Sequence, residues 1–221
     1  MTDTTEIAEK TEQASSAFKL IVCLGNPGAE YAETRHNAGF KVGSELLGRH
    51  GGVKSAWQPE NGELFDLTIA GRAVLLLKPM TYMNSSGDAV VGVTAHFGIS
   101  PSEVLVISDC LDLPLGRLRM RPGGSSGGQK GVRSILVRLE TEAVPRLRVG
   151  IGRPQSSECS VIDYVLASWT SVELEVLPEI LRKAADMAAK AVSCGLEAAM
   201  NDCNSWSADN NNAEKQQGDQ R

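Results

Sequence analysis

The stretch Lys19–Gly28, KLIVCLGNPG, is a short apolar run that ends in a turn of glycine, asparagine and proline. Such a run, bounded by turn residues, is typical of a buried β-strand. Val104–Ser108 (VLVIS) and Arg146–Gly152 (RLRVGIG) have the same character, and GRLRMR at 116–121 alternates as a half-exposed strand does. Two more apolar runs, ELFDLTIA and RAVLLLK, flank Gly71 and predict a hairpin over 63–78.

Helical patterns lie between these strands. They run from His36 to His50, from a capping Ser85 to Gly98, onward from the glycine-rich segment 122–131, and onward from the capping box Thr170-x-x-Glu173. Strands that alternate with helices predict an α/β domain. Because the hairpin adds an antiparallel strand, we expect a mixed, mostly parallel twisted sheet flanked by helices.

The 221 residues are enough for one compact core with appended ends. Residues 1–17 are acidic and residues 201–221 are polar, so neither segment can bury enough apolar surface to offset its ordering entropy. We therefore expect disordered tails at 1–17 and 201–221 around a domain at 18–200. No signal peptide and no apolar run of about 18 residues is present, which favours the cytoplasm.

The five cysteines are scattered and lack CxxC spacing. They therefore suggest neither a disulfide framework nor a zinc site, and we expect reduced thiols, no metal and no cofactor. Cys110 could act as a nucleophile, although a small buried residue is the more common role for a cysteine at the end of a strand.

The formal net charge is −5, but the charge is unevenly distributed. Residues 116–156 contain nine Lys and Arg residues against two Glu, a local charge of +7. This segment could bind a polyanion such as RNA on one face, or it could be an ordinary solvated surface.

Four polar loops follow predicted strands, at 25–37, 81–87, 108–112 and 122–131. Ligands of open α/β sheets bind beyond the carboxyl ends of the strands, where such loops gather. His36 is the one histidine in these loops, and imidazole, which ordinarily titrates near pH ~6.5, is a natural general base. Asp109 is a candidate to orient it, a pairing that the sequence alone leaves open.

Other hydrolase and nucleotide-binding motifs fail. Lys130 follows Gln129 and precedes Gly131, which does not match a P-loop, and Gly25–Gly28 lacks the GxGxxG spacing of dinucleotide sites. No GxSxG is present either. Hydrolysis by an activated water and simple binding both remain open.

LGNPGAEYAETRHNAGF at Leu24–Phe40 resembles the signature of bacterial-type peptidyl-tRNA hydrolases. KPMTYMNSSG, SDCLDLPLG and RLRVGIGRP resemble further blocks of that family in the same order, and the similarity extends from Lys19 to Met200. The resemblance implies a monomeric α/β enzyme that needs no metal. Its substrate would be peptidyl-tRNA, whose ester it cuts to free tRNA after abandoned translation.

The resemblance also implies residue roles. His36 would be the catalytic base, Asp109 its orienting acid, and Asn26 the group that recognises the blocked amino end of the substrate. Tyr31, Tyr82 and Asn84 would contact the tRNA end or the adjacent peptide.

The sequence departs from the family at the glycine-rich loop, where GGHNG is common and this chain has Gln129 and Lys130. Lys130 therefore takes the place of an asparagine usually assigned to tRNA contact. Lysine can bind phosphate but cannot accept a hydrogen bond.

A catalytically silent RNA-binding homologue of the splicing-facilitator type is the alternative function. The presence of Asn26, His36, Asn84 and Asp109 together favours the enzyme, because a pure binder needs neither a base nor its orienting acid.

Overall fold

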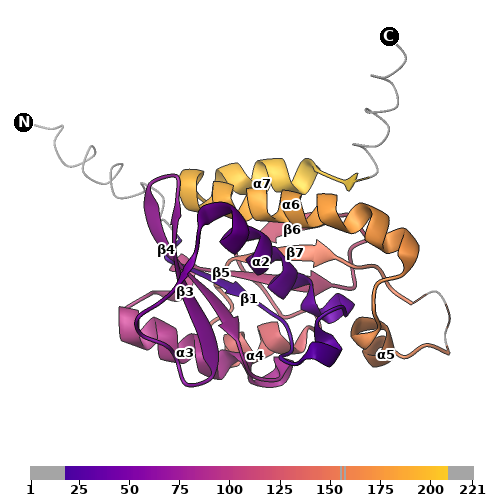
Figure 1. The fold of residues 1–221 in the computed structure, drawn as a ribbon, viewed down its shortest axis with the longest axis horizontal. Helices are drawn as coiled ribbons and strands as arrows, with labels where there is room; N and C mark the ends of the chain where they lie inside the picture. Colours follow the sequence, from indigo (N-terminus) through magenta and orange to yellow (C-terminus); the bar gives the residue numbers. More distant parts are fainter. Residues whose placement is uncertain (1–17, 155, 157, 209–221) are drawn as a thin grey trace, which may run out of the picture.

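The computed structural model describes residues 18–208, except 155 and 157. Its centre is a seven-stranded sheet with the order β2-β3-β4-β1-β5-β7-β6 (Figure 1). The strands are β1 (Leu20–Cys23), β2 (Val53–Lys54), β3 (Gly62–Ile69), β4 (Arg72–Pro79), β5 (Val104–Cys110), β6 (Leu118–Arg121) and β7 (Arg146–Gly150).

The middle of the sheet is parallel and its borders are antiparallel. β1 pairs in parallel with β4 and β5, and β5 pairs in parallel with β7. The predicted hairpin is β3 with β4, and β6 runs antiparallel to β7 at the far edge. The predicted mixed, mostly parallel α/β fold is confirmed.

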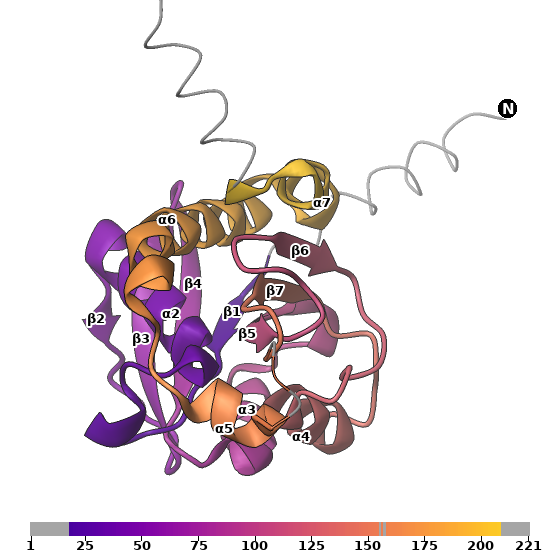
Figure 2. The same cartoon turned by 90° about the vertical axis from the view of Figure 1, so that its right-hand side faces the viewer.

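Helices cover both faces of the sheet, as Figures 1 and 2 show from two sides. α2 (Ala38–His50), α6 (Ser171–Cys194) and α7 (Leu196–Ser205) pack on one face, and α3 (Ser86–Phe97) and α4 (Lys130–Arg138) pack on the other. α5 (Val161–Leu166) precedes α6, and short 3₁₀ turns lie at Ala29–Tyr31, Arg35–Asn37, Met83–Ser85 and Pro101–Glu103.

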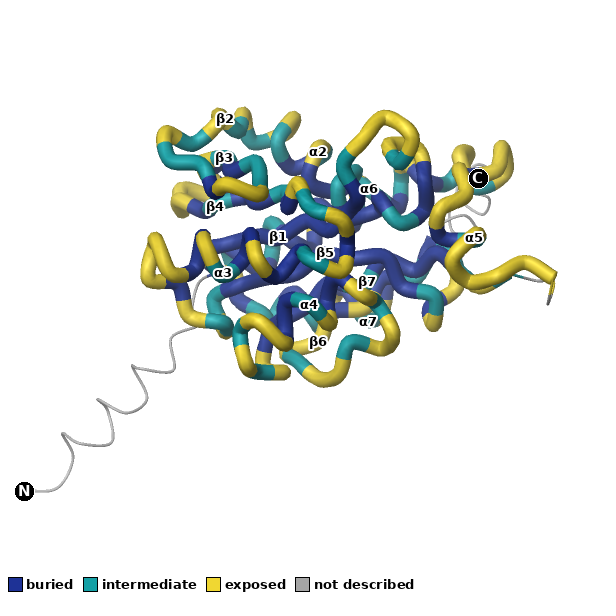
Figure 3. The backbone as a smooth tube through the Cα atoms, turned by 90° about the horizontal axis from the view of Figure 1, so that it is seen from below, coloured by how far each residue is buried: buried dark blue, intermediate teal, exposed yellow. Residues whose placement is uncertain are grey.

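The central strand β1 is apolar on both faces because both faces are covered. Leu20 and Val22 belong to the core on the α3 and α4 side, whereas Ile21 and Cys23 belong to the core on the α2 and α6 side. All four are fully buried, and Figure 3 shows the buried strands β1, β5 and β7 inside a more exposed shell. Burial also raises the pKa of the Cys23 thiol to about 12.

The domain boundary predicted at Met200 is too early. α7 continues to Ser205 and buries Cys203 and Trp206. Side-chain contacts at and next to the edge strand β6 hold this segment. Arg117 donates to the carbonyl oxygens of Asn204 and Trp206, and the Asn204 side chain pairs with the backbone of Met120. The polar end of α7 thus provides hydrogen-bond partners for the edge strand β6. Amino-acid composition alone does not reveal this contact. The remainder of the predicted tails, 1–17 and 209–221, lies outside the described residues.

Three local predictions differ from the structure. Asp109 lies within β5 rather than just past its end, because β5 continues to pair with β7. Ser85 precedes α3 as predicted but makes no capping hydrogen bond with its side chain. The short helix α5 was not expected. The capping box at Thr170 and Glu173 is present and begins α6.

Candidate active site

The carboxyl ends of the parallel strands meet at one edge of the sheet, and a cleft of about 1260 Å³ opens there. Asn26 follows β1, Tyr82 and Asn84 follow β4, and Asp109 is near the end of β5. All seven predicted site residues line this cleft: Asn26, Tyr31, His36, Tyr82, Asn84, Asp109 and Lys130. The structure therefore places residues from four separate segments around one opening.

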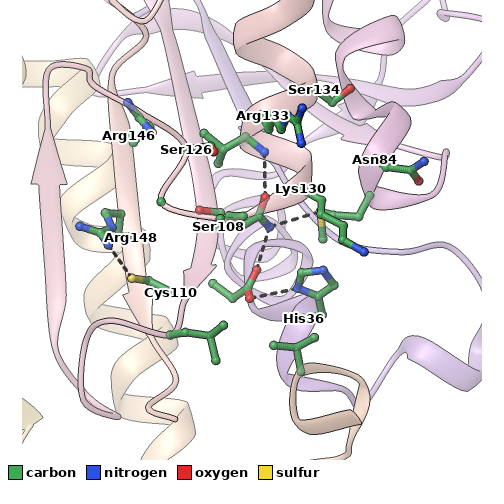
Figure 4. A pocket seen from close by; sticks show the side chains of 18 of the residues that line it. His36, Asn84, Ser108, Cys110, Ser126, Lys130, Arg133, Ser134, Arg146 and Arg148 are labelled. Atoms are coloured by element: carbon green, nitrogen blue, oxygen red, sulfur yellow. Dashed lines mark hydrogen bonds and ion pairs between the residues drawn. The ribbon is translucent and has the colours of Figure 1, made fainter. Parts of the chain in front are cut away.

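His36 and Asp109 form a hydrogen-bonded pair, with 3.0 Å between His36 Nδ1 and Asp109 Oδ2 (Figure 4). The Asp109 side chain is only 3 % exposed and that of His36 is 12 % exposed. A carboxylate on Nδ1 favours the tautomer with a proton there, which leaves the lone pair on Nε2 free to accept a proton. The geometry is that of an oriented general base.

A close backbone approach holds the turn that carries His36. The amide of Phe40 donates to the carbonyl oxygen of Leu24 at the end of β1. A Cβ at Gly39 would lie 2.5 Å from that same oxygen and 2.6 Å from the carbonyl oxygen of Ile107 in β5. Only glycine lets the first turn of α2 lie against both the end of β1 and the backbone of β5.

Arg35, the neighbour of His36, fixes the same turn from the other side. It is buried, its guanidinium makes two hydrogen bonds to the Glu173 carboxylate at 3.1 and 2.6 Å, and it lies over the ring of Tyr164. Burial would raise the pKa of Glu173, but hydrogen bonds from Arg35 and Thr170 outweigh burial and lower it. The His36 turn is thereby tied to the start of α6.

Asn26 is held with one amide group turned to the cleft. Its backbone N–H and C=O both pair with the Asn37 side chain, at 2.8 and 3.0 Å, and its Oδ1 accepts from the Met83 N–H at 2.9 Å. Its Nδ2 has no hydrogen-bond partner within the described part of the chain. One oriented N–H donor is therefore available to a ligand, from a residue only 7 % exposed.

Tyr31 is half-buried, whereas Tyr82, Asn84 and Lys130 are exposed at the cleft. Lys130 is the first residue of α4 and has no ion pair among the described residues. Asn84 and Lys130 lie on one side of the view in Figure 4, opposite Arg146 and Arg148. The exposed side chains thus form a rim around the buried pair.

Arginines cover the other end of the cleft. In the β6–β7 register Arg119 lies opposite Arg148 and Arg121 lies opposite Arg146, and all four line the cleft. Like charges directly across strands are destabilising. Burial and the nearby charge of Arg148 lower the pKa of Arg146, with a smaller contribution from Arg121. This arginine array is suited to an anionic ligand.

Two arginines of the array have internal partners. Arg146 donates to the carbonyl oxygens of Ser125, at 2.6 Å, and of Gly124, so it holds the glycine-rich loop. Arg148 contacts the thiol of Cys110 at 2.9 Å and the carboxylate of Asp112 at 3.2 Å. The side chains of Arg119 and Arg121 are exposed and make no hydrogen bond or ion pair within residues 18–208, the undescribed 155 and 157 aside.

The structure also bears on the alternative chemistries. Cys110 is buried, as a structural cysteine is, and His36 pairs with Asp109 rather than with its thiol. No three His, Cys, Asp or Glu side chains of the described residues come together as a metal site would require. None of the described helices is long and apolar enough to cross a membrane.

Comparison with known proteins assigns this chain to a family. The sequence model of the peptidyl-tRNA hydrolase family matches residues 20–214. This chain belongs to the peptidyl-tRNA hydrolase family. The family resemblance predicted from the motifs is confirmed.

Individual relatives agree over most of their length. The peptidyl-tRNA hydrolase of Aquifex aeolicus is 44 % identical over 187 residues, which are 85 % of this chain and 96 % of the relative. That of Chloroflexus aggregans is 48 % identical over 183 residues, which are 82 % and 96 % of the two chains. The crystal structure of the Acinetobacter baumannii peptidyl-tRNA hydrolase is similar with a TM-score of 0.82, at 37 % identity over 89 % of this chain and 99 % of the other.

Sequence analysis missed three structural features of the cleft in this peptidyl-tRNA hydrolase family member. Gln129 contacts Asp109, Asn37 holds the Asn26 backbone, and α5 brings the exposed apolar residues Val161 and Ile162 to the rim. Gln129 and Asn37 lie within sequence motifs that mark the site. Their hydrogen-bond partners, however, depend on the tertiary fold.

Proposed function

We propose that this chain hydrolyses the ester that joins a peptide to tRNA, with His36 as general base and Asp109 as its orienting acid. The observation that carries the proposal is the 3.0 Å pair between these side chains, at the strand edge where Asn26 presents a free amide. Membership of the peptidyl-tRNA hydrolase family supports it.

In the proposed reaction, Nε2 of His36 takes a proton from a water molecule as the water oxygen attacks the ester carbonyl carbon. Asp109 stabilises the imidazolium that forms, since its carboxylate faces Nδ1. The bond between the carbonyl carbon and the ribose oxygen then breaks, and the imidazolium returns its proton to that oxygen. The products are a peptide with a free carboxyl group and a tRNA with a free terminal hydroxyl.

Asn26 gives selectivity for blocked substrates. Its Oδ1 is occupied by the Met83 N–H, so the group free to read the substrate is the Nδ2 donor. This donor matches the carbonyl oxygen of the first peptide bond, or of an N-acetyl group. An aminoacyl-tRNA with a free amino group lacks that oxygen and leaves the donor unpaired, which costs about 1–3 kcal/mol.

The basic surface binds the tRNA body. Seven of the nine basic residues of segment 116–156 line the cleft, which supports the RNA-binding interpretation over a merely solvated surface. Arg119 and Arg121 are positioned to meet phosphates, and Lys130 with Arg133 extends the positive surface along α4. Tyr31, Tyr82 and Asn84 contact the unpaired tRNA end or the adjacent peptide.

The exposed apolar side of α5 faces the same cleft and suits the side chains of the peptide. The enzyme acts as a cytoplasmic monomer that needs no metal or cofactor and returns tRNA to translation after drop-off.

The test is incubation of the purified chain with N-acetylaminoacyl-tRNA in excess EDTA, with free aminoacyl-tRNA as the comparison. We expect release of deacylated tRNA from the blocked substrate alone. Binding without release would show instead a silent RNA-binding homologue, and release that stops in EDTA would show that a metal is required.

A further inference from the structure

Gln129 connects three parts of the cleft through one side-chain amide. Its Nε2 donates to Asp109 Oδ1 at 3.0 Å and lies 3.3 Å from the sulfur of Met83. Its Oε1 accepts from the Val132 N–H at 2.7 Å, which makes Gln129 the N-cap of α4. Dashed lines in Figure 4 mark the hydrogen bonds between the side chains that it draws, beside the labelled His36.

The two ends of the amide cannot be exchanged. If the amide were flipped, Oε1 would face the Asp109 carboxylate and Nε2 would face the Val132 N–H, so both hydrogen bonds would be lost. The helix cap therefore determines which group of Gln129 faces Asp109, and the result is a fixed N–H donor. Gly131 lets α4 come this close, because a Cβ there would lie 2.5 Å from the Met83 sulfur.

Asp109 depends on this donor. Its carboxylate is buried and its two oxygens have one side-chain partner each among the described residues, His36 on Oδ2 and Gln129 on Oδ1. No lysine or arginine forms an ion pair with it in the described part of the chain. A buried carboxylate that loses one of two hydrogen bonds becomes less well satisfied and less well oriented.

We propose that Gln129 is a positioning residue for catalysis: its capped amide holds Asp109 in the orientation that directs His36. The proposal rests on the proposed function and adds to it a residue that the proposed reaction did not use. An amide does not titrate, so the His36–Asp109 pair keeps a single uncharged neighbour on Oδ1 at every working pH. The other charged or titratable side chains that line the cleft are Tyr31, Tyr82, Asp88, Cys110, Asp112, Arg119, Arg121, Lys130, Arg133, Arg138, Arg146 and Arg148.

Two substitutions remove the hydrogen-bond donor to Asp109 but keep an N-cap for α4. Gln129→Glu keeps the length and the Oε1 acceptor for Val132 but places a second carboxylate against Asp109. Gln129→Ser keeps a good N-cap residue that is too short to reach Asp109. Each should lower kcat about 10- to 100-fold, as expected for loss of a hydrogen bond to a charged group, with KM nearly unchanged. In Gln129→Glu the acid limb of the kcat profile should also move to higher pH, because added negative charge favours the imidazolium.

The matched control is Gln58→Glu. Gln58 also makes three hydrogen bonds with its amide, to the backbone of Ser55 and Leu64, but does not line the cleft. This variant should lower the thermal stability without moving the pH profile. Gln129→His, which restores a donor, should recover most of the kcat lost in Gln129→Ser.

The decisive measurement is the pH titration of the His36 imidazole by NMR in the free protein, together with kcat profiles. We expect the titration to move to higher pH in Gln129→Glu and to stay in place in Gln58→Glu. If Gln129→Glu changes neither the titration nor kcat, or if the loss in Gln129→Ser falls on KM alone, Gln129 does not position Asp109. If the wild-type chain does not hydrolyse the ester but the titration still moves, the proposed function fails and the contact to Asp109 stands.

Discussion

Replacement of Asn26 by Asp changes one atom of the group that we expect to read the substrate. An Asp at this position retains an oxygen for the Met83 N–H, and the Asn37 contacts to the backbone do not involve the side chain of residue 26. The Nδ2 donor, which faces the cleft without a partner in the described residues, becomes an oxygen. The fold should therefore survive while the contact to the substrate carbonyl is lost.

The size of the effect follows from this single donor. A lost hydrogen bond that leaves a buried acceptor unsatisfied costs about 1–3 kcal/mol, which corresponds to about 5- to 150-fold in kcat/KM. Asn26→Ala also frees the buried Met83 N–H, so it should lose activity and unfold at lower temperature.

The assay compares kcat/KM for N-acetylaminoacyl-tRNA and for free aminoacyl-tRNA, with thermal melting as the check on folding. Asn26→Asp should reduce the preference for the blocked substrate in a protein that still folds and melts in one cooperative transition. A variant that melts normally and keeps the full preference would refute the role of Asn26 and place discrimination elsewhere in the cleft.

The remaining predictions concern binding and stability. Changing Arg119 and Arg121 to Gln should weaken tRNA binding and reduce the salt slope by roughly one unit per lost phosphate contact, with little effect on a minimal peptidyl ester; an unchanged slope would exclude both side chains as phosphate ligands. Glu173→Gln should lower the free energy of unfolding at pH 7 by roughly 1.5–3 kcal/mol, because the buried Arg35 loses its charged partner and retains only an amide oxygen. The pKa of Glu173 is lowered in the folded state. The stabilisation is therefore complete above the unfolded pKa of ~4.3 and is lost as the pH falls through the folded pKa. The free energies of unfolding of wild type and Glu173→Gln should then converge in acid. A difference that grows in acid would contradict this.

The sequence predicted the parts of the fold that depend on local pattern. The strand at 19–24, the hairpin around Gly71 and the capping box at Thr170 are signals carried by neighbouring residues. The end of the domain was placed too early because α7 is polar. Its attachment to β6 depends on Asn204 and on Arg117, far apart in the sequence.

For the site, too, local motifs were predictable and tertiary contacts were not. The seven predicted residues lie in recognisable motifs, so they could be identified from the sequence, and they line one cleft. The contacts that position them could not be predicted from the sequence. The bond from Gln129 to Asp109, the clamp from Arg35 to Glu173 and the opposed arginines of β6 and β7 join residues that only the folded sheet brings together.

The central claim is that His36 activates water, and the most direct test is the single-turnover rate of the wild-type chain and of His36→Ala. The substrate is N-acetylaminoacyl-tRNA in excess EDTA at neutral pH, with substrate binding and thermal melting measured on both proteins. The account predicts that His36→Ala folds and binds the substrate but cleaves it about 10²- to 10⁴-fold more slowly. A folded His36→Ala protein that cleaves at a rate near that of the wild type would contradict it.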